Sequence, residues 1–135
     1  MSFDPAAQGW RRYEDKALPQ VTPGQWIREE GEGFAFGFET GSAQENGRGV
    51  IHGGILATYI DHTIGRTAYR AAKAAAVATI QLDLHYLAAV RAGDFVEARA
   101  EVTRLTRAVI FLRGTLAVGD RAVLAASGIW KILGR

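Results

Sequence analysis

The 135-residue sequence has no cysteine, and no apolar run approaches the length of a membrane-spanning helix. Without cysteine, disulfides, thiolate metal sites and a cysteine nucleophile are all excluded. A membrane helix needs roughly 20 apolar residues. The opening stretch MSFDPAAQGW also lacks the apolar segment of a secretory signal. We therefore expect a cytoplasmic protein with no membrane partner.

Runs of like charge are also missing. The 16 Lys and Arg residues are dispersed along the chain and nearly balanced by 14 Asp and Glu, which leaves a net charge of +2. This pattern does not indicate a nucleic-acid partner, although it suits a modestly basic site for a small polyanion. The length predicts one domain spanning residues 1–135, and the 48% hydrophobic content is ordinary for a folded protein.

The first half of the chain predicts two short structures before one long helix. A leading helical segment is expected over about residues 1–23, with Asp4 as N-cap, Pro5 in the first turn, and Pro19 and Pro23 at its end. Residues 25–40 then read as a hairpin that turns at a Gly-Glu-Gly sequence. A glycine-rich loop leads into the long helix, which we expect over residues 53–73.

The second half changes to a period of two, which is typical of strands. In the first of them, Ile80, Leu82 and Leu84 are expected on the face opposite Thr79 and Gln81. Four consecutive strands are predicted, over residues 79–87, 94–105, 108–118 and 121–133. Their short connections favour antiparallel pairing, so the fold class is α+β, with one helix against an antiparallel sheet.

A helical wheel divides the long helix into two faces and a boundary strip. The face expected to pack on the sheet holds Leu56, Ile60, Thr63, Ile64 and Thr67, and the opposite face holds Ile55, Tyr59, His62 and Arg66. Asp61 lies at the boundary beside Gly54, Thr58 and Gly65. These three small residues would let another backbone or a flat ligand approach, and we expect them to bind substrate. Asp61 is then either a base in a crevice or a solvated surface residue.

The entry to this helix favours the first interpretation. At Gly53 and Gly54 the unpaired N–H groups and the positive end of the helix dipole suit an oxyanion or a polarised carbonyl. Asn46 and His52 could add polar contacts. However, Asp61 lies eight residues beyond Gly53, about 12 Å along the axis at 1.5 Å per residue. One reacting carbonyl cannot meet both, so we expect a site shared by two subunits across a two-fold interface.

The spaced set Asn46, Gly49, His52-Gly53-Gly54 and Asp61 resembles the hot-dog-fold acyl-CoA thioesterases, particularly the phenylacetate-degradation type. The stretch LDLHYLAAVRAGD is similar to the strand and turn that follow the helix in that family. The resemblance covers about residues 30–133. It implies a long helix wrapped by an antiparallel sheet, a homodimer with a continuous sheet, and often a homotetramer.

The resemblance also implies hydrolysis of an acyl-CoA to free acid and CoA without a cofactor. By position, Asp61 is the catalytic acid that activates water or attacks the thioester, while the Gly53 N–H and Asn46 hold its oxygen. His52 would shape the loop, and Thr79 would orient the water. Some relatives place a hydroxyl residue one helical turn after the acid, where this chain has Gly65.

Several alternatives stay open. The same fold could bind acyl-CoA without catalysis, or carry dehydratase-like chemistry. The three histidines lack ligand spacing, so no metal site is expected. Ser127 lacks the context of a nucleophile elbow and reads as a strand position. The sequence leaves open the acyl group, the base or nucleophile role of Asp61, and which basic residues meet the CoA phosphates.

Overall fold

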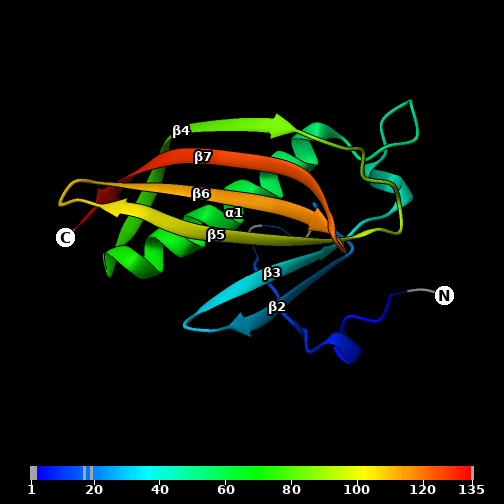
Figure 1. The fold of residues 1–135 in the computed structure, drawn as a ribbon, viewed down its shortest axis with the longest axis horizontal. Helices are drawn as coiled ribbons and strands as arrows, with labels where there is room; N and C mark the ends of the chain where they lie inside the picture. Colours follow the sequence, from blue (N-terminus) through cyan, green and yellow to red (C-terminus); the bar gives the residue numbers. More distant parts are fainter. Residues whose placement is uncertain (1–2, 17, 19, 135) are drawn as a thin grey trace.

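The structure, a computed structural model, describes residues 3–16, 18 and 20–134. It consists of one long helix and an antiparallel sheet that wraps around it (Figure 1). The elements are β1 (Arg11–Arg12), β2 (Gly24–Glu30), β3 (Gly33–Glu39), α1 (Gly53–Ala72), β4 (Ala76–Tyr86), β5 (Phe95–Leu105), β6 (Val109–Val118) and β7 (Arg121–Leu133), with 3-10 turns at Ala6–Gln8 and Ser42–Gln44. The α+β class, the hairpin, the long helix and the four consecutive strands are confirmed.

The seven strands form a single sheet in the order β1-β2-β3-β5-β6-β7-β4, and every neighbouring pair is antiparallel. After β3 the chain passes through α1 and then enters the sheet at its far edge as β4. Among the residues that the structure describes, this 11-residue strand pairs only with β7. One long edge of the sheet is therefore available for pairing with another strand.

The helix is buried over more of its circumference than the wheel predicts. Leu56, Ile60, Thr63 and Ile64 are buried as expected. Tyr59, expected on the opposite face, is also fully buried, because its ring stacks on Phe38 at 4.2 Å. The wheel allows for one covered face, whereas here Phe38 of β3 covers a second side of the helix. That part of the prediction is wrong.

The predicted leading helix is also wrong. The chain forms a single 3-10 turn at Ala6–Gln8, with the N–H of Ala6 donating to Asp4 Oδ1 at 3.2 Å, and then continues extended into β1. Trp10 packs against Ala35 and Phe95 in a small apolar cluster separate from the main core. Burial of this large aromatic side chain favours the extended path over a helix. Pro19, expected to end the helix, lies outside the described residues.

A β-bulge changes the facing of side chains in β4. Thr79 pairs with Trp130 and Gln81 with Ile129, which leaves Ile80 as the extra residue. The predicted alternation placed Thr79 on the face opposite Leu82. Because the bulge shifts the register by one, both residues face the helix, and Ile80 is left 54% exposed. The predicted alternation is therefore wrong at the bulge. This error affects the candidate site, because it changes the direction in which Thr79 faces.

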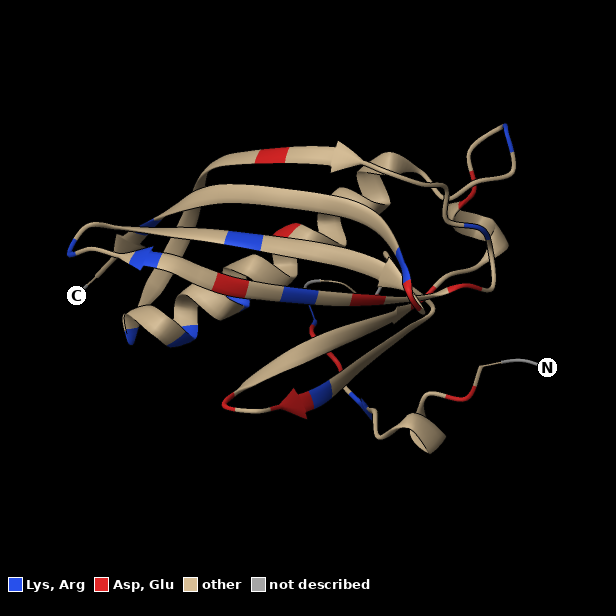
Figure 2. Ribbon diagram, in the orientation of Figure 1, with Lys and Arg blue, Asp and Glu red and all other residues tan. Residues whose placement is uncertain are grey.

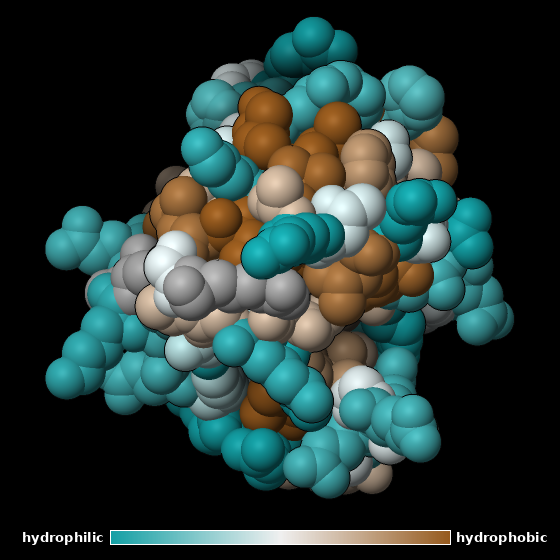
Figure 3. All heavy atoms as spheres, turned by 90° about the vertical axis from the view of Figure 1, so that its left-hand side faces the viewer, coloured by the Kyte–Doolittle hydropathy of each residue, from teal (hydrophilic) through white to brown (hydrophobic). Residues whose placement is uncertain are grey.

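Charge is spread widely over the surface, and basic residues gather where α1 ends and β5 turns into β6 (Figure 2). Apolar side chains also remain exposed at this end of the molecule (Figure 3). They include Tyr69, Leu105 and Leu133. Over the part of the chain that the structure describes, no helix is long and apolar enough to cross a membrane.

Candidate active site

The carboxylate of Asp61 is held by a residue that is distant in sequence. The hydroxyl of Thr79 donates a hydrogen bond of 2.9 Å to Asp61 Oδ1. The bulge at Ile80 turns Thr79 toward α1, and without it this side chain would face away from the helix. The structure therefore brings together the predicted catalytic acid and the predicted water-orienting hydroxyl.

Asp61 and Thr79 line one cavity of about 430 Å³ between α1 and the start of β4. Gly65 lies beside them, and a Cβ at this position would meet Trp130 Nε1 at 3.5 Å. The missing side chain leaves the indole edge of Trp130 on the cavity wall. Arg66 and Tyr69 complete the wall toward the end of the helix, with the guanidinium 5.8 Å from the ring centroid. The cavity thus combines a half-buried carboxylate, a hydroxyl and aromatic surface.

His62 lies next to Asp61 but faces into the fold. Its side chain is only 8% exposed, its ring meets Phe36 edge-on at 4.9 Å, and Nδ1 lies 3.7 Å from Asp15 Oδ2. Burial is the main cause that lowers the pKa of His62, and the nearby Asp15 carboxylate opposes it. The wheel placed His62 on the outer face, and this prediction is wrong because the N-terminal segment covers it.

The residues predicted at the entry to α1 lie apart from Asp61. Gly53 and Asn46 line a different cavity, of about 330 Å³, together with Tyr86 and apolar residues of the β4–β5 connection. The Tyr86 hydroxyl donates to the carbonyl of Gly53 at 2.7 Å. Its ring lies so close that a Cβ on residue 53 would meet Cε1 at 3.3 Å. The absence of a side chain at Gly53 is therefore a packing requirement.

The loop before the helix holds Asn46 in a defined orientation. Asn46 Oδ1 accepts hydrogen bonds from the backbone N–H groups of Arg48 at 2.8 Å and Val50 at 3.4 Å. Because the side-chain oxygen is used within the loop, the amide N–H groups are the atoms that can serve a ligand. Gln44 anchors the base of this loop: its Nε2 donates to the Tyr59 hydroxyl at 2.7 Å in the core.

The remaining predicted residues contribute less directly. His52 is exposed and precedes α1 without a side-chain cap, and its backbone N–H donates to Gln44 O at 3.0 Å. It therefore shapes the loop through its main chain. Thr58 donates its hydroxyl to the carbonyl of Gly54 at 2.9 Å. Neither Gly54 nor Thr58 lines the two cavities just described, whereas Gly65 lines the one that holds Asp61.

The two groups of predicted residues are separate within one chain. Asp61 lies eight residues beyond Gly53 on the same helix, so about 12 Å of axis separates these two predicted site residues. They line different cavities. In residues 3–16, 18 and 20–134 no group of three or more His, Asp or Glu side chains is placed to hold a metal ion.

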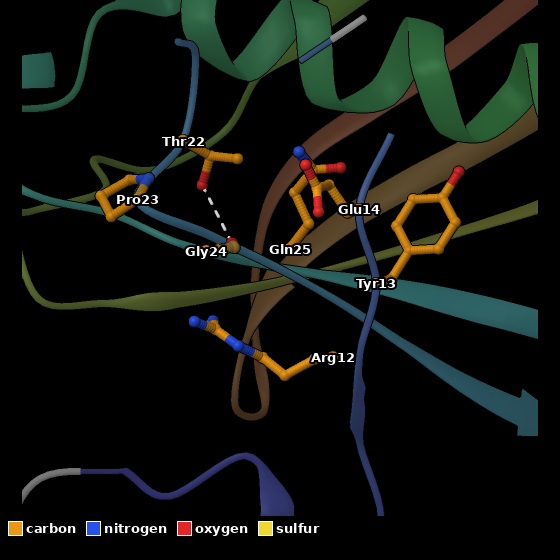
Figure 4. Close-up of a pocket in the computed structure, with 7 residues that line it drawn as sticks. All are labelled: Arg12, Tyr13, Glu14, Thr22, Pro23, Gly24 and Gln25. Carbon is orange, nitrogen blue, oxygen red and sulfur yellow. Dashed lines mark hydrogen bonds between the residues drawn. The ribbon is translucent and has the colours of Figure 1, made fainter. Parts of the chain in front are cut away.

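A further cavity, of about 460 Å³, lies between the N-terminal segment and the start of β2 (Figure 4). Arg12, Glu14 and Gln25 line it, but these polar side chains do not converge on one point, and the Thr22 hydroxyl is turned to the carbonyl of Gly24 at 3.1 Å. This cavity contains none of the residues that the sequence points to. Size alone does not make it the site.

A helix of this length wrapped by an antiparallel sheet defines the hot-dog fold, as the resemblance implied. The sequence model of the thioesterase superfamily matches residues 48–125 of this chain, which include Asp61, Gly53 and Thr79. The chain therefore belongs to the thioesterase superfamily, a family of enzymes that hydrolyse thioesters.

Among curated proteins, the chain is similar to PA0474 of Pseudomonas aeruginosa, which carries the name of an esterase. The two are 31% identical over 88 residues, 64% of this chain and 66% of that protein. The match thus spans slightly less than two thirds of this relative.

Solved structures share the fold. Conserved protein PA5202 of Pseudomonas aeruginosa has a TM-score of 0.79 at 23% identity, covering 89% of this chain and 95% of that one. The PaaI protein from the phenylacetic acid degradation operon of Escherichia coli gives 0.76 at 20%, covering 89% and 86%. The BH2602 protein of Bacillus halodurans, solved with CoA, gives 0.68 at 22%, covering 73% and 70%. At these identities the likeness shows the hot-dog fold alone.

Sequence reasoning missed two contacts that organise the site. Tyr86 falls within the predicted strand over residues 79–87, and the pattern does not indicate that its hydroxyl meets Gly53. Gln44 lies within the predicted glycine-rich loop, and the sequence does not indicate that this polar residue is only 8% exposed. The sequence signal for either contact is weak. The Tyr86 contact depends on how β4 packs on the helix, and the Gln44 contact depends on how the loop packs on it.

Proposed function

We propose that this protein hydrolyses acyl-CoA thioesters to the free acid and CoA, without a cofactor, in a site built from two subunits. The observation that carries the proposal is the position of Asp61. Its carboxylate accepts a hydrogen bond from Thr79 at the wall of one cavity, while the donors able to polarise a carbonyl, Gly53 and Asn46, lie in another. A complete site would combine the Asp61 cavity of one subunit with the Gly53 cavity of its partner.

In the proposed reaction, the Gly53 N–H and the Asn46 amide donate to the thioester oxygen and stabilise the negative charge that develops on it. Asp61 removes a proton from a water that attacks the carbonyl carbon, and Thr79 orients that water. The carbon–sulfur bond breaks, and the CoA thiolate takes up a proton as it leaves. Alternatively, Asp61 attacks the carbon itself, and water then hydrolyses the mixed anhydride. Both routes give the same products and need the same groups.

The free edge of β4 supports the dimer. This strand carries Thr79 toward Asp61 at one end and Tyr86 toward Gly53 at the other. Antiparallel pairing of two copies of β4, centred between these residues, would set each Thr79–Asp61 pair against the Gly53 end of the partner. Ile80 lies on this edge strand and Leu87 directly follows it. Both side chains are exposed in the single chain and would become buried in the dimer.

The wider setting follows from the resemblance and the comparisons. The similarity to a protein solved with CoA supports an acyl-CoA ligand. We infer a single hot-dog domain over residues 1–135, a homodimer that can assemble further to a homotetramer, and a cytoplasmic location. Small residues at Gly54, Thr58 and Gly65 would leave room for substrate beside the helix, and His52 would keep the loop in place.

Release of free thiol from a panel of acyl-CoAs tests the proposal. Aryl, hydroxylated aryl and medium-chain thioesters should be compared, since the sequence does not fix the acyl group. We expect turnover of at least one class, and we expect Asp61→Asn to abolish most of it while CoA still binds. Binding of acyl-CoA without turnover by the wild-type protein would instead favour an acyl-CoA-binding protein of the same fold.

A further inference from the structure

The first turn of α1 is weakly constrained by its own sequence. Two consecutive glycines, Gly53 and Gly54, begin the helix, and the preceding His52 provides no side-chain cap. Glycine has more backbone freedom than any other residue, so these two positions can sample many orientations. A backbone N–H that must stabilise a developing oxyanion is effective only when it is held in place before the reaction. Some other part of the fold has to supply that constraint.

Tyr86 makes the contacts that could supply it. Its hydroxyl donates to the Gly53 carbonyl at 2.7 Å, which fixes the peptide group on the C-terminal side of Gly53. Its ring lies against the Cα of Gly53, at a distance that leaves a Cβ only 3.3 Å from Cε1. Tyr86 is nevertheless 52% exposed and lines the same cavity as Asn46. It therefore contacts the donor residue from the side on which the substrate is proposed to bind.

We propose that Tyr86 is a positioning residue that holds Gly53 so that its N–H meets the thioester oxygen. The inference rests on the proposed function, because it assigns Tyr86 to the oxyanion half of that site. It also explains the glycine at position 53, since the space of a side chain there is taken by the tyrosine ring. Tyr86 acts on the half-site of its own subunit, which serves the Asp61 of the partner.

The direct test compares Tyr86→Phe, which removes the hydroxyl and keeps the ring, with Ser127→Ala, which removes a hydroxyl from an exposed residue of β7. We expect Tyr86→Phe to lower kcat roughly 2- to 12-fold, the range of one neutral hydrogen bond, with KM nearly unchanged. Ser127→Ala should keep wild-type kcat, and urea unfolding should show both variants folded. A wild-type kcat in Tyr86→Phe, or an equal loss in Ser127→Ala, would overturn the inference.

Mixed dimers identify the half-site on which Tyr86 acts. In a heterodimer of Tyr86→Phe with Asp61→Asn, one site pairs an intact Asp61 with an intact Tyr86 and Gly53. If Tyr86 positions the donor, this site should turn over at the wild-type rate. If Tyr86 instead acts on the Asp61 of its own chain, the site should show the slower Tyr86→Phe rate, and our inference is wrong. Failure of Asp61→Asn and Asn46→Ala to complement each other would count against the shared site itself, whatever Tyr86 does.

Discussion

Thr79 Oγ1 donates to Asp61 Oδ1 at 2.9 Å, and this contact links two residues that are 18 positions apart. The hydrogen bond depends on the bulge at Ile80, which turns the start of β4 so that the Thr79 hydroxyl faces the helix. The contact fixes one rotamer of the carboxylate and leaves its second oxygen available to a water or a substrate. The first two predictions concern this pair.

Asp61→Asn should reduce kcat by about 10² to 10⁴-fold, the usual contribution of a general base, because the amide cannot take up a proton. Its near-identical shape should leave the fold and the affinity for CoA unchanged. Steady-state kinetics with the best thioester, together with CoA binding by calorimetry, provide the measurement. Near-full turnover in a folded variant would remove Asp61 from its proposed role.

Thr79→Val keeps the shape and the β-branching of the side chain but removes its hydroxyl. We expect kcat to fall by about 5- to 50-fold, because the Asp61 carboxylate loses a charge-assisted hydrogen bond in a partly exposed site. Thr79→Ser, which retains the hydroxyl, should recover most of the activity. If valine and serine behave alike, the hydroxyl has no part in the reaction.

Gly53→Val tests the crowded entry to the helix. The new Cβ would lie 3.3 Å from the Tyr86 ring, so the ring or the first turn must move. Displacement of an oxyanion donor by a fraction of an ångström should lower kcat by about 10- to 100-fold. Gly33→Ala is the matched control, because a Cβ there meets nothing closer than 3.8 Å and the hairpin is remote from the site. Wild-type kinetics in Gly53→Val would contradict the assigned role.

A separate prediction concerns stability. Hydrogen bonds from Arg99 and Arg28 lower the pKa of Glu30 from 4.5 to about 2. Because the folded-state pKa is lowered, Glu30 contributes stability above its unfolded pKa and loses that contribution as the pH falls toward about 2. Glu30→Gln should therefore destabilise the protein at about pH 7, by up to about 1 kcal/mol after solvent screening, and by less than half as much at about pH 3.

Urea unfolding at the two pH values measures this difference. Glu101→Gln is the matched control, because Glu101 pairs with Arg113 on the same sheet but its side chain is 60% exposed. We expect little effect of that variant at either pH. A destabilisation by Glu30→Gln that stays constant between the two pH values would contradict the prediction.

The sequence predicts local structure well where one physical pattern dominates. The sequence predicts a helix over residues 53–73, and the observed helix ends one residue earlier, at Ala72. The prediction succeeds because the glycine entry and the apolar period of this helix are strong signals. The hairpin turn at the Gly-Glu-Gly sequence and the period-two strands follow from similarly local rules. All of the proposed site residues except Thr79 lie on the same helix and its loop, where spacing along one axis limits what can meet.

What could not be predicted depends on contacts between elements. The burial of Tyr59 requires Phe38 of β3 to cover a second side of the helix, and a wheel has no information about which strands lie there. The facing of Thr79 depends on a bulge that no residue type marks in the sequence. The extended N-terminal segment is set by where Trp10 finds an apolar partner. In each case tertiary packing decided between local structures that the sequence alone allows.

The central claim is that each active site takes Asp61 from one subunit and Gly53 with Asn46 from the other. Asn46→Ala alone should cost about 10 to 10³-fold in kcat, as for other oxyanion donors. Heterodimers of Asp61→Asn with Asn46→Ala, isolated through two different affinity tags, have one site with both lesions and one with neither. We predict that thiol release reappears, at about half the wild-type rate per dimer. Mixed dimers that mass spectrometry confirms but that remain inactive would contradict the shared site.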